Sequence, residues 1–430
     1  MSSGIVKGII RLSASVCLLF LLLSSASAQK LLIFMDFDQT DHLKAYGVAY
    51  RCLKQGYNVE WLLNYRGGSF MSDYADEIAQ VCRLRGVAYS VASPAEEASI
   101  RKTIEDNNME SVLLEKAPKV AIYAPPISKS EPWDDAVNLA LTYAEISFEV
   151  IWDEEVLAGR LHDYDWVHLH HEDFTGQYGK FYGSYRNALW YKQNKALNEA
   201  TAKKLGFRKV SQLELAVAKA IKEYVAGGGF LFAMCSATDT YDIALSAEGV
   251  DIVPTELDGD PADRDCQERL DYSKTFAFEN FKVELNPMVY EHSDIDTSPT
   301  RGMRIPGPET DYFTLFDFSA KYDPVPTMLI QDHLPVVNGF LGQCTGFHKD
   351  KVKRYITILG ETEGKGEVKY LHGNFGRGTF TFLGGHDPED YQHMIGDPPT
   401  QLELHKNSPG YRLILNNVLF PAARKKERKT

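Results

Sequence analysis

The stretch FLFAMCSATDTYDIAL, residues 230–245, joins a strand, a tight turn and a helix, and the predicted fold is centred on it. Apolar residues 230–234 predict a buried strand, and the small residues after Cys235 lead into a helical pattern. A cysteine at such a turn benefits from the free N–H groups of the helix start, which lower a thiol pKa and stabilise an oxyanion. Cys235 is therefore a candidate nucleophile, and the alternative is a small side chain packed in the sheet.

Strand and helix patterns alternate before and after this stretch. Residues 31–64 and 119–155 each show an apolar strand, an amphipathic helix and a second strand. Such alternation predicts β-α-β units, so we expect an α/β protein with a largely parallel sheet and an N-terminal β-α-β unit. Residues 174–194 are rich in aromatic side chains, and short strands and prolines follow residue 250, which indicates an inserted aromatic and β-rich region.

The first 28 residues show the pattern of a secretory signal peptide. Lys7 and Arg11 precede an apolar run at 16–23, which is too short for the roughly 20 residues of a membrane-spanning helix. We expect an exported protein, periplasmic or extracellular, without a transmembrane segment. The expected segments are a signal peptide at 1–28, an N-terminal α/β unit at 29–115, a larger α/β domain at 116–422 and a basic tail at 423–430.

Composition and charge exclude several classes of partner. The formal net charge is −13, which disfavours nucleic acid because phosphate binding needs a basic face. The chain has neither a GxxxxGK[ST] loop nor a GxGxxG loop after a strand, and we predict no cofactor. The five cysteines outside 1–28 are widely spaced and odd in number, which argues against a disulfide scaffold. The oligomeric state stays open.

The segment HLHHED, residues 168–173, follows a predicted strand and concentrates imidazole and carboxylate groups. Ligands of open α/β sheets bind beyond the carboxyl ends of strands, so this segment is a candidate pocket wall. The alternative is a metal-dependent hydrolase centred on His168, His170 and His171, with Glu172 or Asp173 as a further ligand. No motif of fixed spacing such as H-E-x-x-H supports it, and we predict no metal. The predicted substrate-binding residues are His168, His170, His171, Glu172, Tyr178, Tyr182 and Ser236.

The segment FLGGHDPEDYQH, residues 382–393, places His386 directly after a strong strand. A thiol nucleophile needs a base, and the base is oriented by a neighbouring carboxylate. Asp387 and Glu389 are the nearest acids, so we predict that they and His386 belong to the catalytic group. The alternative is a surface turn with a capping aspartate.

Cys235 between a strand and a helix, with His386 after a late strand, resembles the class I glutamine amidotransferase-like fold. The resemblance covers roughly residues 117–420 and implies a flavodoxin-like sheet. It also implies that Cys235 is the nucleophile, His386 the base and Glu389 or Asp387 the orienting acid. The 151 residues between the cysteine and the histidine are more than the family usually has.

Longer stretches look like an exported bacterial family that commonly carries the label asparagine synthetase B. They are DHLKAYGVAY (41–50), WLLNYRGGSF (61–70), WVHLHHEDFTGQYGKFYGSYRNA (166–188) and GGGFLFAMCSATD (227–239). The labelled activity uses a cysteine directly after the initiator methionine and an SGGxDS loop for ATP. This chain has Ser2 at that position and no such loop.

Three functions follow from these patterns. The first is an exported amidotransferase-like hydrolase that uses a thiol to cleave an amide or an ester. The second is a non-catalytic envelope protein that binds a glycan, a peptide or another small molecule. The third is the glutamine-hydrolysing asparagine synthetase of the family label.

Overall fold

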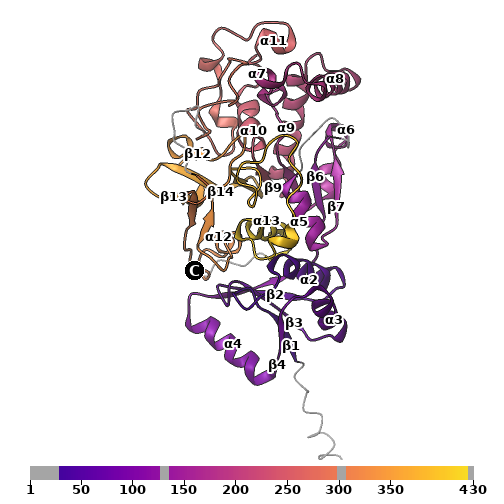
Figure 1. Ribbon diagram of the computed structural model, residues 1–430, viewed down its shortest axis with the longest axis vertical. Coiled ribbons are helices and arrows are strands. Elements are labelled where there is room, and N and C mark those ends of the chain that lie inside the picture. The colour runs from indigo at the N-terminus through magenta and orange to yellow at the C-terminus, as the bar shows by residue number, and fades with distance from the viewer. Residues whose placement is uncertain (1–28, 126–134, 298–306, 425–430) are drawn as a thin grey trace, which may run out of the picture.

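A computed structural model describes residues 29–125, 135–297 and 307–424 (Figure 1). The predicted signal peptide and most of the predicted basic tail lie outside these residues. Within them, no helix combines the length and the apolar character that a membrane span needs.

The N-terminal part of the chain folds around a five-stranded antiparallel sheet in the order β4-β1-β3-β2-β5. Its helices α2 and α3 pack on one face of the sheet, and Ile100 and Ile104 of α4 pack against Leu32, Leu62 and Met71 on the other. A capping box at the start of α4 and a left-handed glycine at the end of α3 fix two of the helix ends. The elements are β1 (Lys30–Ile33), α2 (His42–Lys54), β2 (Val59–Leu63), β3 (Ser69–Asp73), α3 (Asp76–Arg85), β4 (Tyr89–Ala92), α4 (Pro94–Asp106) and β5 (Glu110–Leu114).

The prediction of an N-terminal β-α-β unit in a parallel sheet is wrong. The chain turns back after β2 and inserts β3 between β1 and β2, so that Trp61 pairs with Phe70 and Ile33 pairs with Phe70 from the other side. Gly67 and Gly68 have φ of 75° and 88°, which permits the tight return. Each neighbouring pair in the resulting split β-α-β arrangement is antiparallel.

The second sheet has ten strands and is mixed. The order β11-β10-β13-β14-β15-β9-β8-β6-β7 begins with antiparallel pairs and becomes parallel from β15 onward, and β12 pairs with β14. The strands are β6 (Val120–Tyr123), β7 (Phe148–Ile151), β8 (Trp166–Leu169), β9 (Phe230–Met234), β10 (Tyr312–Leu315), β11 (Val336–Asn338), β12 (Phe347–His348), β13 (Thr357–Thr362), β14 (Glu367–Phe375) and β15 (Gly378–Leu383).

The predicted flavodoxin-like, largely parallel α/β fold is therefore also wrong. The hairpin turn after Phe375 makes β14 antiparallel to β15, and β13, β10 and β11 extend the sheet with further antiparallel pairs. The inserted region is helical where its aromatic side chains are densest, because α7 lies there and α8 begins at Leu189. Only the part of the sheet from β15 to β7 keeps the parallel pairing that the alternation of strands and helices predicts.

Helices cover both faces of the mixed sheet (Figure 1). Apolar side chains of α5 and α13 share a core with Ile122, Phe232 and the N-terminal unit, while those of α9 and α10 pack with Val167 and Ala233 on the opposite face. The helices are α5 (Ala136–Ala144), α6 (Asp153–Leu157), α7 (Tyr182–Tyr185), α8 (Leu189–Lys204), α9 (Val210–Ala226), α10 (Ala237–Ser246), α11 (Thr255–Asp258), α12 (Pro324–Leu329) and α13 (Pro409–Leu419).

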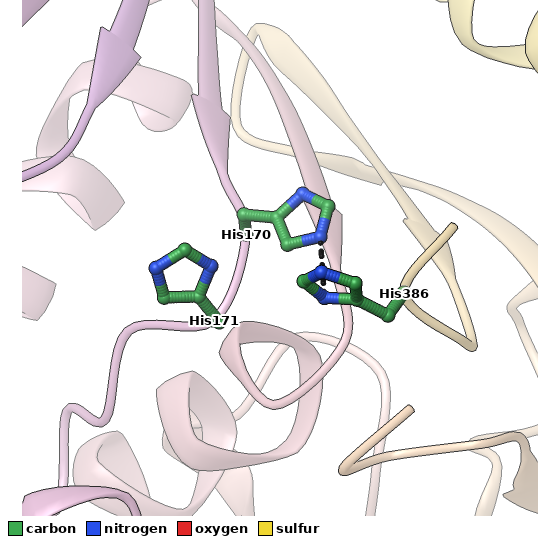
Figure 2. A group of neighbouring side chains, drawn as sticks. All are labelled: His170, His171 and His386. Atoms are coloured by element: carbon green, nitrogen blue, oxygen red, sulfur yellow. Dashed lines mark hydrogen bonds between the residues drawn. The ribbon is translucent and has the colours of Figure 1, made fainter. Parts of the chain in front are cut away.

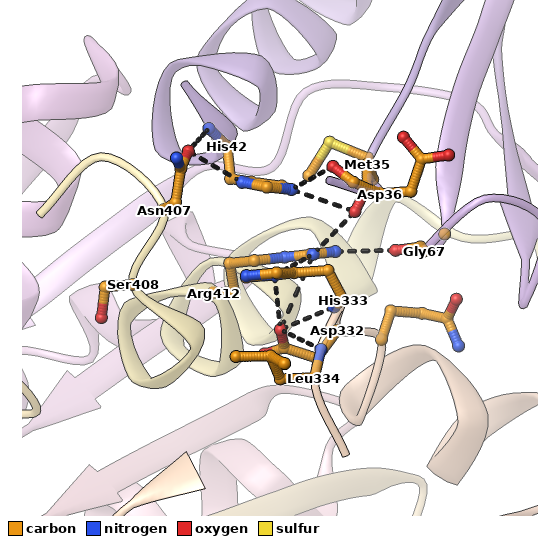
Figure 3. A network of polar contacts seen from close by, with 12 residues as sticks. Met35, Asp36, His42, Gly67, Asp332, His333, Leu334, Asn407, Ser408 and Arg412 are labelled. Atoms are coloured by element: carbon orange, nitrogen blue, oxygen red, sulfur yellow. Dashed lines mark hydrogen bonds and ion pairs between the residues drawn. The ribbon is translucent and has the colours of Figure 1, made fainter. Parts of the chain in front are cut away.

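Arg412 of α13 ties the N-terminal unit to the rest of the chain (Figure 3). Its guanidinium is fully buried and donates to the carbonyl oxygens of Met35, at 2.9 Å, and Gly67, at 2.7 Å. The carboxylate of Asp332 lies 3.7 Å away and balances its charge. A buried charge is tolerated only when it is paired and hydrogen-bonded, so this network fixes how the two parts of the chain dock.

Replacing Arg412 with Met should destabilise the protein by about 3–5 kcal/mol, because the charge of Asp332 would stay buried without the guanidinium that balances it, and the carbonyl oxygens of Met35 and Gly67 would lose the donors that Arg412 supplies. Urea unfolding followed by circular dichroism measures the change. Arg424→Met is the matched control: that side chain is 67% exposed, and its loss should cost no more than about 0.5 kcal/mol. Equal effects of the two substitutions would contradict the assigned role.

Candidate active site

Cys235 occupies a strained turn between β9 and α10. Its φ is 49°, in the left-handed region that residues other than glycine rarely adopt. The backbone N–H of Cys235 donates to the carbonyl oxygen of Gly385 at 3.1 Å, which continues the pairing of β9 with β15 beyond the ends of the strands. Such strain costs of order 1–3 kcal/mol and is concentrated at functional sites, so this turn is a candidate position for a catalytic residue.

The sulfur of Cys235 is buried and surrounded by backbone N–H groups. The N–H of Gln343 points at Sγ from 3.3 Å. Burial raises the pKa of the thiol to about 11, although the N–H groups of Gln343, Ser236 and Cys344 act in the opposite direction. The resting side chain is therefore a neutral thiol at pH 7, and it needs a base before it can act as a nucleophile.

His386 follows β15 and lines the same cavity as Cys235. This cavity has a volume of about 900 Å³. Burial lowers the pKa of His386 well below its usual value, and the neighbouring imidazoles of His170 and His171 lower it further. Its ring is thus neutral and able to accept a proton. Side chains of Phe181, Tyr185, Tyr290, Glu291, Gln343 and Tyr391 form part of the wall.

Hydrogen bonds fix the tautomers of a row of three imidazoles. Nδ1 of His168 lies 3.1 Å from the carbonyl oxygen of Phe232, which can only accept, so Nδ1 carries the hydrogen. Nδ1 of His170 lies 3.4 Å from Oδ1 of Asp135, and an ionised carboxylate can only accept, so this nitrogen also carries a hydrogen. Burial lowers the pKa of His170, so its Nε2 keeps a lone pair and accepts from Nδ1 of His386 at 3.0 Å. The lone pair of His386 is left on Nε2, which is buried and has no hydrogen-bond partner among the described residues.

Asp135 supplies the negative charge beside this row. Its Oδ1 lies 3.4 Å from Nδ1 of His170 and 3.6 Å from Nε2 of His168. Burial by itself would raise the pKa of Asp135, but the two imidazoles outweigh it and hold that pKa well below the usual range. Asp135 also caps α5 by accepting from the N–H groups of Val137 and Asn138, so its position is fixed by the helix.

The acids predicted to orient His386 make other contacts. Asp387 accepts from the hydroxyl of Tyr411 at 2.9 Å and from the N–H of Glu389 at 2.8 Å. Glu389 lies 2.9 Å from Nδ1 of His405. Because Nδ1 of His386 is directed at Nε2 of His170, an imidazole holds the place that the family resemblance gave to a carboxylate.

The predicted substrate-binding residues do not all meet in one place. His171 lines the cavity of Cys235 and also a smaller neighbouring cavity of about 60 Å³, which Glu172 and Tyr178 line as well. Ser236 is fully buried at the start of α10. The ring of Tyr182 lies under the guanidinium of a neighbouring arginine, with 5.6 Å between them.

Two residues of the site were not predicted. Asp135 follows β6 across residues 126–134, which lie outside the described part of the chain, and the only signal in the sequence is its place just before a helical pattern. Gln343 belongs to an irregular segment between β11 and β12 and carries no recognisable motif. Its contact with Cys235 depends on a separation of 108 residues, which periodicity does not reveal.

Comparisons with known proteins leave the family unassigned. No protein-family model and no curated protein matches the chain. Cytoplasmic proteins STM3548 and STM1381 of Salmonella typhimurium align over 71% of this chain and 100% of theirs, at 12% and 13% identity and TM-scores of 0.35 and 0.33. Gan42B, a GH42 β-galactosidase of G. stearothermophilus, aligns over 63% of this chain and 28% of its own at 12% identity and a TM-score of 0.25. All three TM-scores lie below 0.5 and carry no conclusion about function.

Glu172→Gln should change how stability depends on pH. Burial raises the pKa of Glu172 to about 7 from 4.5, so the folded protein keeps a proton that the unfolded chain loses. This carboxyl therefore makes the folded state progressively less stable as the pH rises from about 4.5 to 7.

The variant has no ionisable group at this position. Between pH 5 and 8 its free energy of unfolding should therefore rise relative to that of the wild type by on the order of 2–3 kcal/mol. Chemical unfolding of both proteins at several pH values measures the difference. Parallel profiles would show that Glu172 ionises as readily in the folded protein as in the unfolded chain.

Proposed function

We propose that this protein is an exported hydrolase that cleaves an amide or ester bond, with Cys235 as nucleophile and His386 as general base. The observation that carries the proposal is the left-handed turn at Cys235, whose sulfur faces backbone N–H groups and lines one cavity with His386. The order of a cysteine after one strand and a histidine after the adjacent, later strand supports a relation to the class I glutamine amidotransferases. Export rests on the pattern of residues 1–28.

In this mechanism Nε2 of His386 takes the proton of the Cys235 thiol as the sulfur attacks the carbonyl carbon of the substrate. The new C–S bond gives a tetrahedral intermediate with a negative oxygen. His386 then returns the proton to the leaving amine or alcohol, and a thioester forms. Water activated by His386 attacks the thioester, which releases the acid and restores the thiol.

Backbone N–H groups that face the sulfur are the candidates for binding the oxyanion. The N–H of Gln343 already points at Sγ, and that of Ser236 is directed at it as well. The N–H of Ala237, the next residue along the chain, donates to the carbonyl oxygen of His170 at 3.2 Å. The structure thus favours Gln343 and Ser236 for this role, and donors fixed in advance are the most effective kind.

The wall of the cavity favours a substrate with an apolar or sugar group next to the scissile bond. Phe181, Tyr185, Tyr290 and Tyr391 offer aromatic faces for stacking, and Gln343 adds a polar side chain. A glycan derivative or a peptide fits this lining. Binding without turnover is the second candidate function, and the burial of Cys235, which is only 3% exposed, favours it.

Cys235→Ser and His386→Ala should each lower kcat/KM by about 10²–10⁴-fold on a panel of p-nitrophenyl esters and amides that includes L-glutamine, because each removes one half of the proton-transfer pair. Intact mass spectrometry should find an acyl group on the wild type that is absent from Cys235→Ser. Cys266→Ser is the control, since Cys266 is buried away from the cavity, and it should keep full activity. Unchanged turnover by Cys235→Ser would exclude a thiol mechanism, whereas a ligand that binds without turnover would support the binding function.

A further inference from the structure

We infer that His170, His171 and His386 form a binding site for one divalent transition-metal ion, and that zinc suits it best. One nitrogen of each ring lies within 4.8 Å of the corresponding nitrogens of the other two. Figure 2 shows the rings of His170 and His386 meeting at a hydrogen bond and the ring of His171 lying beside this pair. His170 and His171 come from the segment after β8, and His386 comes from the segment after β15. Three neutral imidazoles are a common ligand set for zinc.

The row of hydrogen bonds presents the lone pairs that a metal needs. The carboxylate of Asp135 can only accept, so Nδ1 of His170, which lies 3.4 Å from it, carries the hydrogen. Nε2 of His170 therefore keeps its lone pair on the side that faces His386. His386 offers Nε2 as it stands, or Nδ1 after a change of tautomer.

The spacing of the rings is close to what coordination requires. Zinc binds imidazole nitrogens at about 2.0–2.1 Å, so two ligands of a tetrahedral ion lie about 3.3 Å apart. Nε2 of His170 and Nδ1 of His386 are 3.0 Å apart. All three nitrogens lie within 4.8 Å of one another, so the proposed ion requires side-chain rotations that shorten the longest separation by up to about 1.5 Å.

Asp135 occupies the position of an outer-shell partner. Its carboxylate lies 3.4 Å from Nδ1 of His170, the nitrogen opposite the one that faces the cluster. Carboxylates that bond to the second nitrogen of a ligating histidine orient the ring and raise its basicity, and their loss typically weakens metal binding by about 10–100-fold. The negative charge of Asp135 also offsets part of the charge of a divalent ion.

The site leaves room for a further ligand. His171 and His386 line the cavity of about 900 Å³, so an ion held by three imidazoles has an open position toward it. A structural zinc site is closed by four protein ligands, whereas a site with three keeps a position for water or a substrate.

Metal binding and the thiol mechanism exclude each other at His386, a consequence that rests on the proposed function. A neutral imidazole has one lone pair, and a metal bound to it leaves none for the proton of Cys235. Zinc should therefore inhibit thiol turnover, and a chelator should restore it. The metal site itself stands whether or not the thiol is catalytic.

Three other groups in the described residues have ligand-like spacing. One of them, Asp135, His168 and His170, belongs to the row of imidazoles and shares His170 with the proposed site, so two separate groups remain. Asp251, Asp258 and Asp260 surround the ammonium of Lys209, which lies 2.5–2.9 Å from all three, and that cation already balances their charge. The second group, Asp390, His393 and Asp397, lies partly exposed in the segment after His386 and has one imidazole instead of three. It serves as the competing site in the experiment.

The experiment titrates the metal-free full-length chain with Zn²⁺ by calorimetry and with Co²⁺ by visible absorption. We expect one equivalent to bind and Co²⁺ to give the strong d–d bands of a four-coordinate site. His171→Ala should weaken binding at least 100-fold. Asp135→Asn, whose amide oxygen still caps α5, should weaken it about 10–100-fold. Asp397→Asn should bind like the wild type.

Two results would overturn the inference: no binding of either ion by a folded protein, or loss of binding in Asp397→Asn instead of His171→Ala. A chelator that abolishes turnover instead of raising it would make the metal a catalytic group, and it would refute the proposed function because His386 could not then act as the base. Cys235→Ser separates the two proposals, because it should lose turnover and keep the Co²⁺ spectrum. If Co²⁺ gives the expected spectrum but the protein shows no thiol-dependent turnover, the proposed function is refuted and the metal site stands.

Discussion

The parallel pairing of β9 with β15 is the constraint on which the site depends. Met234 and Leu383 are partners at the ends of the two strands, and the bond from the N–H of Cys235 to the oxygen of Gly385 carries the alignment one step further. Because parallel strands end at the same edge of a sheet, two segments 151 residues apart in the chain bring a thiol and an imidazole to one cavity. The same alignment holds the left-handed turn at Cys235 in place.

Burial is the second theme of the site, and it shifts the pKa of several titratable groups there. It keeps the Cys235 thiol protonated, keeps His170 and His386 neutral and raises the pKa of Glu172. Asp135 is the exception, since two imidazoles hold it ionised. A neutral imidazole with an uncommitted lone pair suits either a base or a metal ligand, so the same physical environment supports both proposals made for His386.

The docking of the N-terminal unit shows how a buried charge specifies an arrangement. Arg412 donates to the carbonyl oxygen of Met35, just after β1, and to that of Gly67, just before β3. Its ionic partner Asp332 comes from a third segment of the chain. Misplacing any of the three would leave a buried charge or buried carbonyl groups without partners, which costs several kcal/mol. Close packing of α2 on α5 adds to this, because the backbone of Gly47 lies against that of Ala144 too tightly for a side chain.

The periodicity of apolar residues was enough to predict the strand before Cys235 and the helix after it, since each depends on the local sequence. It also marked Cys235, His170, His171 and His386 as candidates, because they follow strands. Which strands are neighbours was decided only in three dimensions: β3 inserts between β1 and β2, and antiparallel strands extend the parallel ones, so both sheets differ from the prediction. The surroundings of His386 were likewise beyond reach. His170 contacts His386, and Asp135 contacts His170, between segments that are distant in the sequence, and such contacts leave no periodic trace in the chain.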